Sequence, residues 1–146
     1  NAPGVAQFLT GTPPILSLAV MDSALDVFAD ITVTDINRKA HALAELFLDL
    51  VTNDEDLQCL TLESKVDPAL RGAQLAFSHP DAYCICRALN KAGVVVDFRN
   101  PDIVRFGFSP LFLRFEDIWR AAQILRKIVK EKTYLADEFS RRLKVT

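Results

Sequence analysis

Residues 93–115, GVVVDFRNPDIVRFGFSPLFLRF, decide the fold of this chain. They hold two short apolar runs, Val94–Val96 and Ile103–Phe108, on either side of a turn at Asn100-Pro101-Asp102. Both runs are rich in β-branched or aromatic residues, and both are bounded by residues that break regular structure. The pattern therefore predicts two β-strands joined by a tight loop.

Arg105 interrupts the second apolar run. Because successive side chains of a strand point to opposite faces, Arg105 would share one face with Gly107. Val104, Phe106 and Phe108 would share the other face. A guanidinium beside a glycine has several donors with free space next to them, which resembles a pocket. An arginine on a strand can equally face water, which is its usual position in proteins. The spacing alone leaves both interpretations open.

The composition is that of an ordinary globular domain. The chain has 146 residues, half of them apolar and a quarter charged, which is enough for one domain with a core. The formal net charge is −2, and the basic residues are interspersed with acidic ones, so nothing indicates a nucleic-acid-binding patch. The sequence predicts no membrane span and no secretory signal. It begins at Asn1 without methionine, which is compatible with the later part of a longer protein.

The three cysteines, Cys59, Cys84 and Cys86, do not form a zinc motif. Their number is odd, the Cys84-Ile-Cys86 spacing is not CxxC, and only His41 and His79 could assist. We therefore expect no metal site, and we expect the cysteines to be buried, reduced thiols. His41 falls off the apolar stripe of its helix and is expected at the surface, whereas His79 is expected to play a structural part at a helix start.

The N-terminal segment contains a candidate anion site at Gly11 and Thr12. Gly11 breaks regular structure, Thr12 can cap a helix, and Pro13 suits the first helical position. A helix is therefore expected from Pro13 to about Phe28. A hydroxyl and backbone N–H groups at a helix start can bind an anion. The alternative is an ordinary helix cap followed by a proline.

The rest of the pattern predicts an α+β fold with four strands and helices packed on one face of the sheet. Thr34 is the expected cap of the second helix. A strand around 75–77 would place Leu75 and Phe77 on one face and Gln74 and Ala76 on the other. The helix between Phe77 and Val94 implies a crossover, which is compatible with a parallel strand pair. Beyond the helix at 13–28 and the strand pair already described, helices are expected at 34–51, 80–92 and 115–132, and strands at 57–62 and 75–77, with a short terminal helix around 135–143.

Five segments taken together resemble the C-terminal part of kynureninases, in particular the bacterial type. Their order and spacing match from about Phe8 to Val129. The segments are FLTGTPPILSL at 8–18, RGAQ at 71–74, FSHP at 77–80, GVVVDFRNP at 93–101 and IVRFGFSPLF at 103–112.

The resemblance implies a pyridoxal-phosphate hydrolase of the aspartate-aminotransferase fold. Such an enzyme cleaves L-kynurenine, or alternatively 3-hydroxykynurenine, in tryptophan catabolism and NAD biosynthesis; the products from L-kynurenine are anthranilate and L-alanine. The family implies a cytoplasmic homodimer with an active site shared between subunits. Residues 1–52 would then connect from the large domain and supply interface helices, and residues 53–146 would form the small C-terminal α+β domain.

The resemblance also implies roles for individual residues. Arg105 would bind the substrate α-carboxylate, because a planar guanidinium matches a carboxylate with two parallel hydrogen bonds. Thr12, with Gly11, would contact the cofactor phosphate of the neighbouring subunit. The lysine that forms the Schiff base with the cofactor lies upstream in this family. We therefore expect no catalytic residue in this segment, and we expect the segment alone to be inactive, since Lys39, Lys65 and Lys91 lack suitable neighbours.

Two alternatives remain at this stage. The chain could be a non-catalytic α+β binding module that keeps the shape of the small domain. It could also belong to another pyridoxal-phosphate enzyme, such as a desulfurase or an aminotransferase, since those enzymes also use an arginine of the small domain for the α-carboxylate. The Gly-Thr-Pro-Pro and Phe-Arg-Asn-Pro segments argue against the second alternative.

Overall fold

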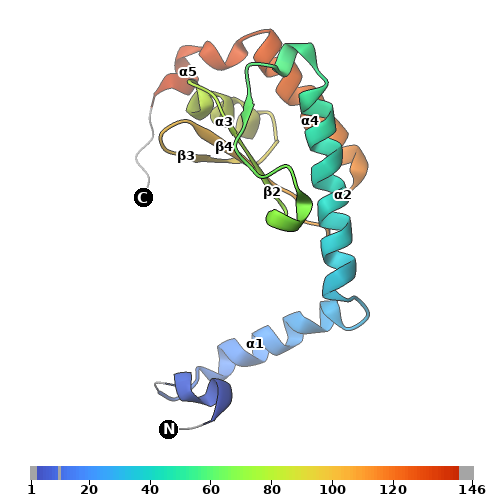
Figure 1. Ribbon diagram of the computed structural model, residues 1–146. Coiled ribbons are helices and arrows are strands. Elements are labelled where there is room, and N and C mark those ends of the chain that lie inside the picture. The colour runs from blue at the N-terminus through green and yellow to red at the C-terminus, as the bar shows by residue number, and fades with distance from the viewer. Residues whose placement is uncertain (1–2, 10, 142–146) are drawn as a thin grey trace. The chain divides into compact units, whose positions relative to one another are not determined.

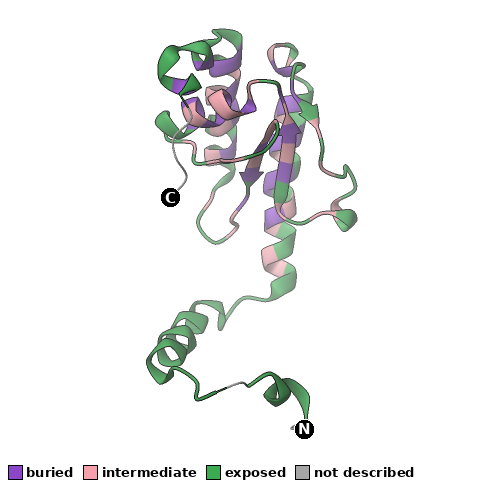
Figure 2. Cartoon of the chain, turned by 90° about the vertical axis from the view of Figure 1, so that its left-hand side faces the viewer, coloured by how far each residue is buried: buried purple, intermediate pink, exposed green. Residues whose placement is uncertain are grey.

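A computed structural model describes residues 3–9 and 11–141 of the chain (Figure 1). The chain divides into two compact units, Asn1–Val33 and Thr34–Thr146. All the buried residues among those that the structure describes belong to the second unit, whereas the described residues up to Thr34 are exposed (Figure 2). No helix in the described part of the chain is both long enough and apolar enough to cross a membrane.

The first unit consists of a 3-10 turn, Gly4–Phe8, the helix α1, Ile15–Leu25, and a second 3-10 turn, Asp26–Phe28. The predicted helix is therefore present, but Thr12 does not cap it. Pro14 occupies the cap position, and no side chain caps the helix. The reason is the Pro-Pro pair, because a residue that precedes a proline is disfavoured in the α conformation. Pro13 is thus kept out of the helix that it was expected to start.

The second unit contains the sheet and the remaining helices. Their order is helix, strand, strand, helix, strand, strand, helix and a short terminal helix, which agrees with the prediction. The elements are α2, Val33–Thr52; β1, Thr61–Leu62; β2, Gln74–Ser78; α3, Ala82–Lys91; β3, Asp97–Arg99; β4, Ile103–Gly107; α4, Phe115–Lys130; and α5, Asp137–Ser140. Short 3-10 turns at Glu55–Leu57, Pro68–Leu70 and Thr133–Leu135 connect some of them. α2 supplies part of the core of this unit.

The four strands form one antiparallel sheet in the order β1-β2-β4-β3. β4 lies between β2 and β3, so the crossover through α3 skips one position in the sheet. The expectation of a parallel pair is therefore wrong, because the two strands that the crossover joins are not neighbours. The β3–β4 hairpin is present as predicted, and the turn between its strands contains a cis Asn100–Pro101 peptide bond.

The strand predicted at Val94–Val96 is displaced to Asp97–Arg99. Gly93 ends α3 with a positive φ of 86°, and the N–H of Val94 donates to the carbonyl of Leu89 at 2.9 Å. Both backbone groups of Val96 then bond to the Asn90 side chain: its N–H donates to Oδ1 at 2.8 Å, and its carbonyl accepts from Nδ2 at 3.1 Å. The end of α3 thus engages the residues that the apolar pattern assigned to a strand.

The core lies on one face of the sheet. Leu75 and Phe77 of β2 share one face, as predicted, and are buried together with Val104 and Phe106 of β4. Phe47 of α2 packs against this face, with its ring centroid 4.6 Å from that of Phe106 and 6.3 Å from that of Phe77. Side chains of α3 and α4 complete the same cluster. The helices therefore cover one face, as expected for a small α+β domain, and leave the face of Arg105 free of core residues.

The predicted strand at 57–62 is reduced to Thr61–Leu62. The first part of that stretch belongs instead to the 3-10 turn that ends at Leu57, where Asp54 caps the turn by accepting from the N–H of Asp56. Cys59 lies between turn and strand and is exposed, so the expectation of a buried thiol is wrong at this position. Cys86 is buried and Cys84 half-buried, and all three thiols are free.

Two helices start away from their predicted caps. α2 begins at Val33, which places Thr34 inside the helix. α3 begins at Ala82 with Asp81 as its cap, two residues after the expected Pro80. His79 is buried just before this cap, and its Nδ1 accepts from the N–H of Asp81 at 2.9 Å. Burial lowers the pKa of His79, and its place in the turn fits the structural part expected of it.

Candidate functional site

The open face of the sheet carries the candidate site. Cross-strand pairing places Ala76 of β2 on one side of Arg105 and Asp97 of β3 on the other. Gly107, two residues along β4, pairs with Gln74, and both are exposed. An added Cβ at Gly107 would meet no atom within 4 Å. Arg105 thus stands between small neighbours on β2 and β4 and an acidic neighbour on β3, as the alternation of the strand predicts for its face.

The carboxylate of Asp97 holds the guanidinium of Arg105. Oδ1 accepts from Nε at 2.9 Å and Oδ2 accepts from Nη2 at 2.5 Å. The side chain of Arg105 is 27% exposed and that of Asp97 is 47% exposed. Arg99 also reaches Oδ2 of Asp97, at 3.3 Å, from the same strand as the carboxylate. The pair is therefore a bidentate ion pair at the boundary with solvent, and its guanidinium is the more buried partner.

The ion pair shifts the pKa of both partners. Hydrogen bonds from Arg105 hold the pKa of Asp97 below its usual value, against a smaller opposing effect of burial. The same hydrogen bonds raise the pKa of Arg105. Both groups thus remain charged at neutral pH.

A second carboxylate can still bind Arg105. A guanidinium has five N–H donors in one plane, and Asp97 uses the edge formed by Nε and Nη2. The other edge, formed by Nη1 and the second hydrogen of Nη2, presents two parallel donors that match a carboxylate. The hairpin therefore orients one edge of the guanidinium through Asp97 and leaves the geometry of the other edge suited to an anionic ligand.

Gly11 and Thr12 lie in the first unit, in a shallow hollow of about 460 Å³ lined also by Phe8, Pro13 and Pro14. Both residues are exposed, and an added Cβ at Gly11 would meet no atom within 4 Å. The two prolines carry no N–H, so the donors of this segment are the Thr12 hydroxyl and the backbone N–H groups before the prolines. These neutral donors can make a hydrogen bond to a phosphate oxygen but bring no positive charge.

The three lysines considered for the Schiff base lie in different surroundings. Lys39 donates to the carbonyl of Pro110 at 2.6 Å, and Lys91 forms an ion pair with Glu138 at 2.6 Å. Lys65 is exposed in the loop between β1 and β2. Across residues 3–9 and 11–141, no group of three or more His, Cys, Asp or Glu side chains could hold a metal ion.

The sequence pattern did not predict that Asp97 pairs with Arg105. Asp97 lies just beyond Val94–Val96, the stretch that the apolar pattern predicts as the strand, so the pattern gives it no part in the site. Its signal was available in the register, since the partner of Arg105 across a short hairpin is fixed by the length of the turn. An acidic residue opposite an arginine on neighbouring strands is a stabilising cross-strand pair.

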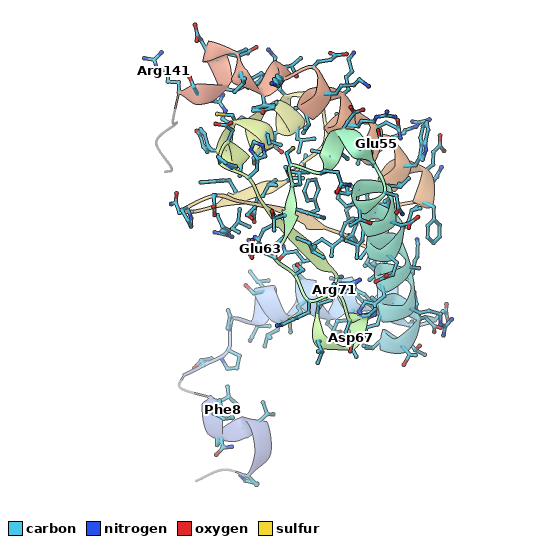
Figure 3. The ribbon with its side chains drawn as sticks, turned by 45° about the horizontal axis from the view of Figure 1, so that its top comes forward. Phe8, Glu55, Glu63, Asp67, Arg71 and Arg141 are labelled. Atoms are coloured by element: carbon cyan, nitrogen blue, oxygen red, sulfur yellow. The ribbon has the colours of Figure 1, made fainter. Side chains whose placement is uncertain are left out.

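Arg71, which leads from the Pro68–Leu70 turn toward β2 (Figure 3), is the most buried arginine side chain among the ion pairs of the described chain, at 4% exposure. Its Nη2 donates to Glu45 on α2. Its Nε and Nη1 are buried and have no partner in the part of the chain that the structure describes. Arg71 therefore links the segment before β2 to α2. The pattern of the RGAQ segment did not predict this structural role.

Comparison with known proteins bears directly on this site. The kynureninase C-terminal domain family matches residues 36–125, which include most of α2, the whole sheet and Arg105. The chain belongs to the kynureninase family. This result agrees with the resemblance described above and favours it over a desulfurase or an aminotransferase.

Kynureninases of known name match almost the entire chain. The kynureninase of Pseudomonas fluorescens is 42% identical over 143 residues, which cover 98% of this chain and 34% of that protein. The kynureninase of Burkholderia pseudomallei strain K96243 is 42% identical over 144 residues, covering 99% of this chain and 35% of that protein. The chain thus spans about a third of the length of these relatives, and its match to the family's C-terminal domain places it toward their C-terminal end.

Proposed function

We propose that this chain is the C-terminal part of a pyridoxal-phosphate-dependent kynureninase that hydrolyses L-kynurenine to anthranilate and L-alanine. The observation that carries the proposal is Arg105, fixed by Asp97 on the open face of a sheet whose sequence belongs to the kynureninase family. In this proposal, the segment binds and orients the amino-acid end of the substrate. The remaining two thirds of the protein supply the rest of the active site.

Arg105 binds the α-carboxylate of the substrate through the edge of the guanidinium that Asp97 leaves open. Two parallel charge-assisted hydrogen bonds fix both the position and the plane of the carboxylate. Fixing this end of the substrate orients the bonds around its α-carbon relative to the cofactor, which is how a positioning contact contributes to rate. This contact does not involve the aromatic ring of the substrate. It is therefore the same for L-kynurenine and for 3-hydroxykynurenine.

Pyridoxal phosphate, when bound, supplies the electron sink for cleavage of the carbon–carbon bond. Of the residues in this chain, Thr12 and the neighbouring Gly11 fit its phosphate, since they offer a hydroxyl and backbone N–H groups in an accessible hollow. They bring no cation, so the charged contacts to the phosphate belong elsewhere in the protein. The Schiff-base lysine likewise belongs to the upstream part, and we expect this segment alone to be inactive.

The first unit has the properties of a segment that packs against other protein surfaces in the complete enzyme. α1 is apolar on all sides, and none of its residues is buried within this chain. Such a helix is stable in water only when other surfaces cover it. The upstream domain and a second subunit of a cytoplasmic homodimer are the surfaces that the family provides, and they would bring Thr12 to the cofactor of the neighbouring subunit.

The test is an assay of the complete protein loaded with pyridoxal phosphate. L-Kynurenine is added, and the formation of anthranilate is followed by its fluorescence while L-alanine is measured separately. Equal amounts of both products are expected. A protein that holds the cofactor and converts L-kynurenine into neither product would overturn the proposed function.

A further inference from the structure

Gln74 lies on the same face of the sheet as Arg105. It is the first residue of β2, and the next residue, Leu75, is buried in the core on the other face. The register pairs Gln74 with Gly107 and Ala76 with Arg105. Because the side chains on one face of a strand recur at every second residue, Gln74 and Arg105 are diagonal neighbours on adjacent strands.

The space between these two side chains is open. Gly107, opposite Gln74, has no side chain, and an added Cβ at this position would meet no atom within 4 Å. Ala76, opposite Arg105, carries only a methyl group. Diagonal neighbours on adjacent strands lie about 7–8 Å apart, a separation that long side chains can span. A small group that lies over Gly107 can therefore reach the ends of both side chains.

The backbone that carries Gln74 is held in place by its neighbours. The carbonyl of Ala73 accepts from the N–H of Phe108 at 3.0 Å, which extends the contact between β2 and the chain after β4 past Gln74. Three residues before Gln74, the side chain of Arg71 donates to Glu45 on α2. Side chains on a rigid strand position a ligand more precisely than side chains on a loop. Gln74 thus has a defined position on the open face.

The amide of Gln74 is available to a ligand. Gln74 is exposed, and its side chain makes no hydrogen bond to residues 3–9 or 11–141. Other polar side chains on this face already have partners. The hydroxyl of Ser78 on β2 donates to Glu63 at 2.7 Å, and the carboxylate of Asp97 on β3 is bound to Arg105. The amide N–H groups of Gln74 can therefore bind a ligand without breaking a contact within the described chain.

The chemistry of the Gln74 amide complements that of the Arg105 guanidinium. A carboxylate has about four lone-pair sites on its two oxygens, and a bidentate contact with the open edge of Arg105 uses two of them. Nε2 of a glutamine carries two donors and adds no charge that would disturb the ion pair between Arg105 and Asp97. Hydrogen bonds with an ionised partner are roughly twice as strong as those between neutral groups. A glutamine donor at this position therefore favours a carboxylate over an uncharged group.

We propose that Gln74 is a second substrate-binding residue, whose Nε2–H group donates to the α-carboxylate that Arg105 binds. The assignment rests on the proposed function, because it takes the ligand of Arg105 to be an amino-acid substrate. The carboxylate lies over Gly107, with Arg105 on one side and Gln74 on the other. Gln74 contributes to specificity in this arrangement, since its donor distinguishes the carboxylate from an uncharged replacement.

The test measures binding, so that it does not depend on turnover. The probe is desaminokynurenine, which is L-kynurenine without its α-amino group, and its primary amide is the matched neutral ligand. Equilibrium dialysis against the complete protein loaded with pyridoxal phosphate gives the Kd of each ligand. Gln74→Met keeps the length of the side chain and removes its donors and its acceptor. We expect this variant to raise the Kd of the acid about tenfold and that of the amide by no more than about threefold.

Gln74→Glu is a second variant of nearly the same shape, in which a carboxylate oxygen replaces the donor. We expect the Kd of the acid to rise more than about tenfold, because two like charges then face each other. The amide is expected to bind at least as tightly as to the wild type, since its NH2 group can donate to the new carboxylate. Gln123 on α4 provides the control, because α4 packs on the core face of the sheet. Gln123→Met and Gln123→Glu should change neither Kd.

Other outcomes overturn the proposal. These are an unchanged Kd for the acid in Gln74→Met, equal losses for the acid and the amide, or a wild type that binds the acid no better than the amide. The L-kynurenine assay of the wild-type protein is read separately. A protein that shows the expected Kd changes but forms neither product would overturn the proposed function and leave the assignment of Gln74 standing. An active protein whose Kd for the acid is unchanged in Gln74→Met would do the reverse.

Discussion

The carboxylate of Asp97 accepts two hydrogen bonds from one edge of the Arg105 guanidinium, across neighbouring strands of a hairpin. This relationship turns a flexible side chain into a fixed one. A free arginine loses rotamer freedom when a ligand binds, at a cost of about 0.5–1.5 kcal/mol. In the folded hairpin, Asp97 has already imposed part of that order.

Replacing Asp97 tests this positioning directly. In the complete protein, Asp97→Asn keeps the size of the side chain and removes its charge and one acceptor. We expect KM for L-kynurenine to rise and kcat/KM to fall by about threefold to tenfold, because Arg105 must then be ordered by the substrate. Steady-state kinetics measures both constants. A lower KM in this variant would mean that Asp97 competes with the substrate and does not orient Arg105.

The same ion pair makes the stability of the folded protein depend on pH in the acidic range. The pKa of Asp97 is lower in the folded protein than its ordinary value near 4, because Arg105 stabilises the carboxylate. Its contribution to stability is therefore present above the unfolded pKa and is lost as the pH falls through the lower, folded pKa. Between pH 5 and pH 3, we expect the denaturant concentration at the unfolding midpoint to fall less in Asp97→Asn than in the wild type, because the variant lacks this one contribution while other carboxylates such as Asp56 still titrate. Parallel losses in the two proteins would contradict this assignment.

Gly93 offers a test of the backbone that shapes the hairpin. Its φ of 86° lies in the left-handed region, where a Cβ is unfavourable, although an added Cβ would meet no neighbouring atom. Gly93→Ala is therefore expected to destabilise the complete protein by about 1 kcal/mol through conformation alone. The matched control is Gly72→Ala, since Gly72 also has open space but no left-handed φ. Chemical denaturation of both variants measures the difference. If Gly72→Ala were as destabilising as Gly93→Ala, the backbone explanation would fail.

Thr12 is tested through cofactor affinity. Thr12→Val keeps the shape and removes the hydroxyl, and we expect the Kd for pyridoxal phosphate in the complete protein to rise by about tenfold, the value of one hydrogen bond to a charged group. Thr12→Ser is expected to retain wild-type affinity. Ser17→Ala in α1 serves as the control, because it removes a hydroxyl from the same unit away from the hollow. Unchanged affinity in Thr12→Val would remove Thr12 from the cofactor site.

The sequence predicted the structure correctly where no long-range contact competed with the local pattern. Alternation on β4 predicted that Val104 and Phe106 share the face opposite Arg105, and the structure confirms this, with both apolar residues buried. Periodicity likewise predicted the buried stripe of α2, because a long helix with one apolar face has one way to pack. The family motifs predicted the kynureninase C-terminal domain, which the comparisons confirm.

Sequence reasoning was wrong where tertiary contacts decided the outcome. The β-branched run Val94–Val96 indicated a strand, but the Asn90 side chain bonds both backbone groups of Val96, and the sheet starts three residues later. The insertion of β4 between β2 and β3 depends on long-range pairing, which no local pattern records. The part of Asp97 was missed for the same reason, since it required the register of the hairpin. The domain boundary at residue 52 and the roles of Thr12 and Gly11 stay predictions.

The measurement that tests the central claim most directly compares two substrates in three forms of the complete protein. The substrates are L-kynurenine and its α-carboxamide, and the proteins are the wild type and Arg105→Lys, with Arg99→Lys as the matched control on the same face of the sheet. We expect Arg105→Lys to lower kcat/KM for L-kynurenine by about 10- to 100-fold, because the bidentate contact is lost. The value for the carboxamide should change little, and Arg99→Lys should affect neither substrate. Equal losses for both substrates in Arg105→Lys would contradict the claim that Arg105 binds the α-carboxylate.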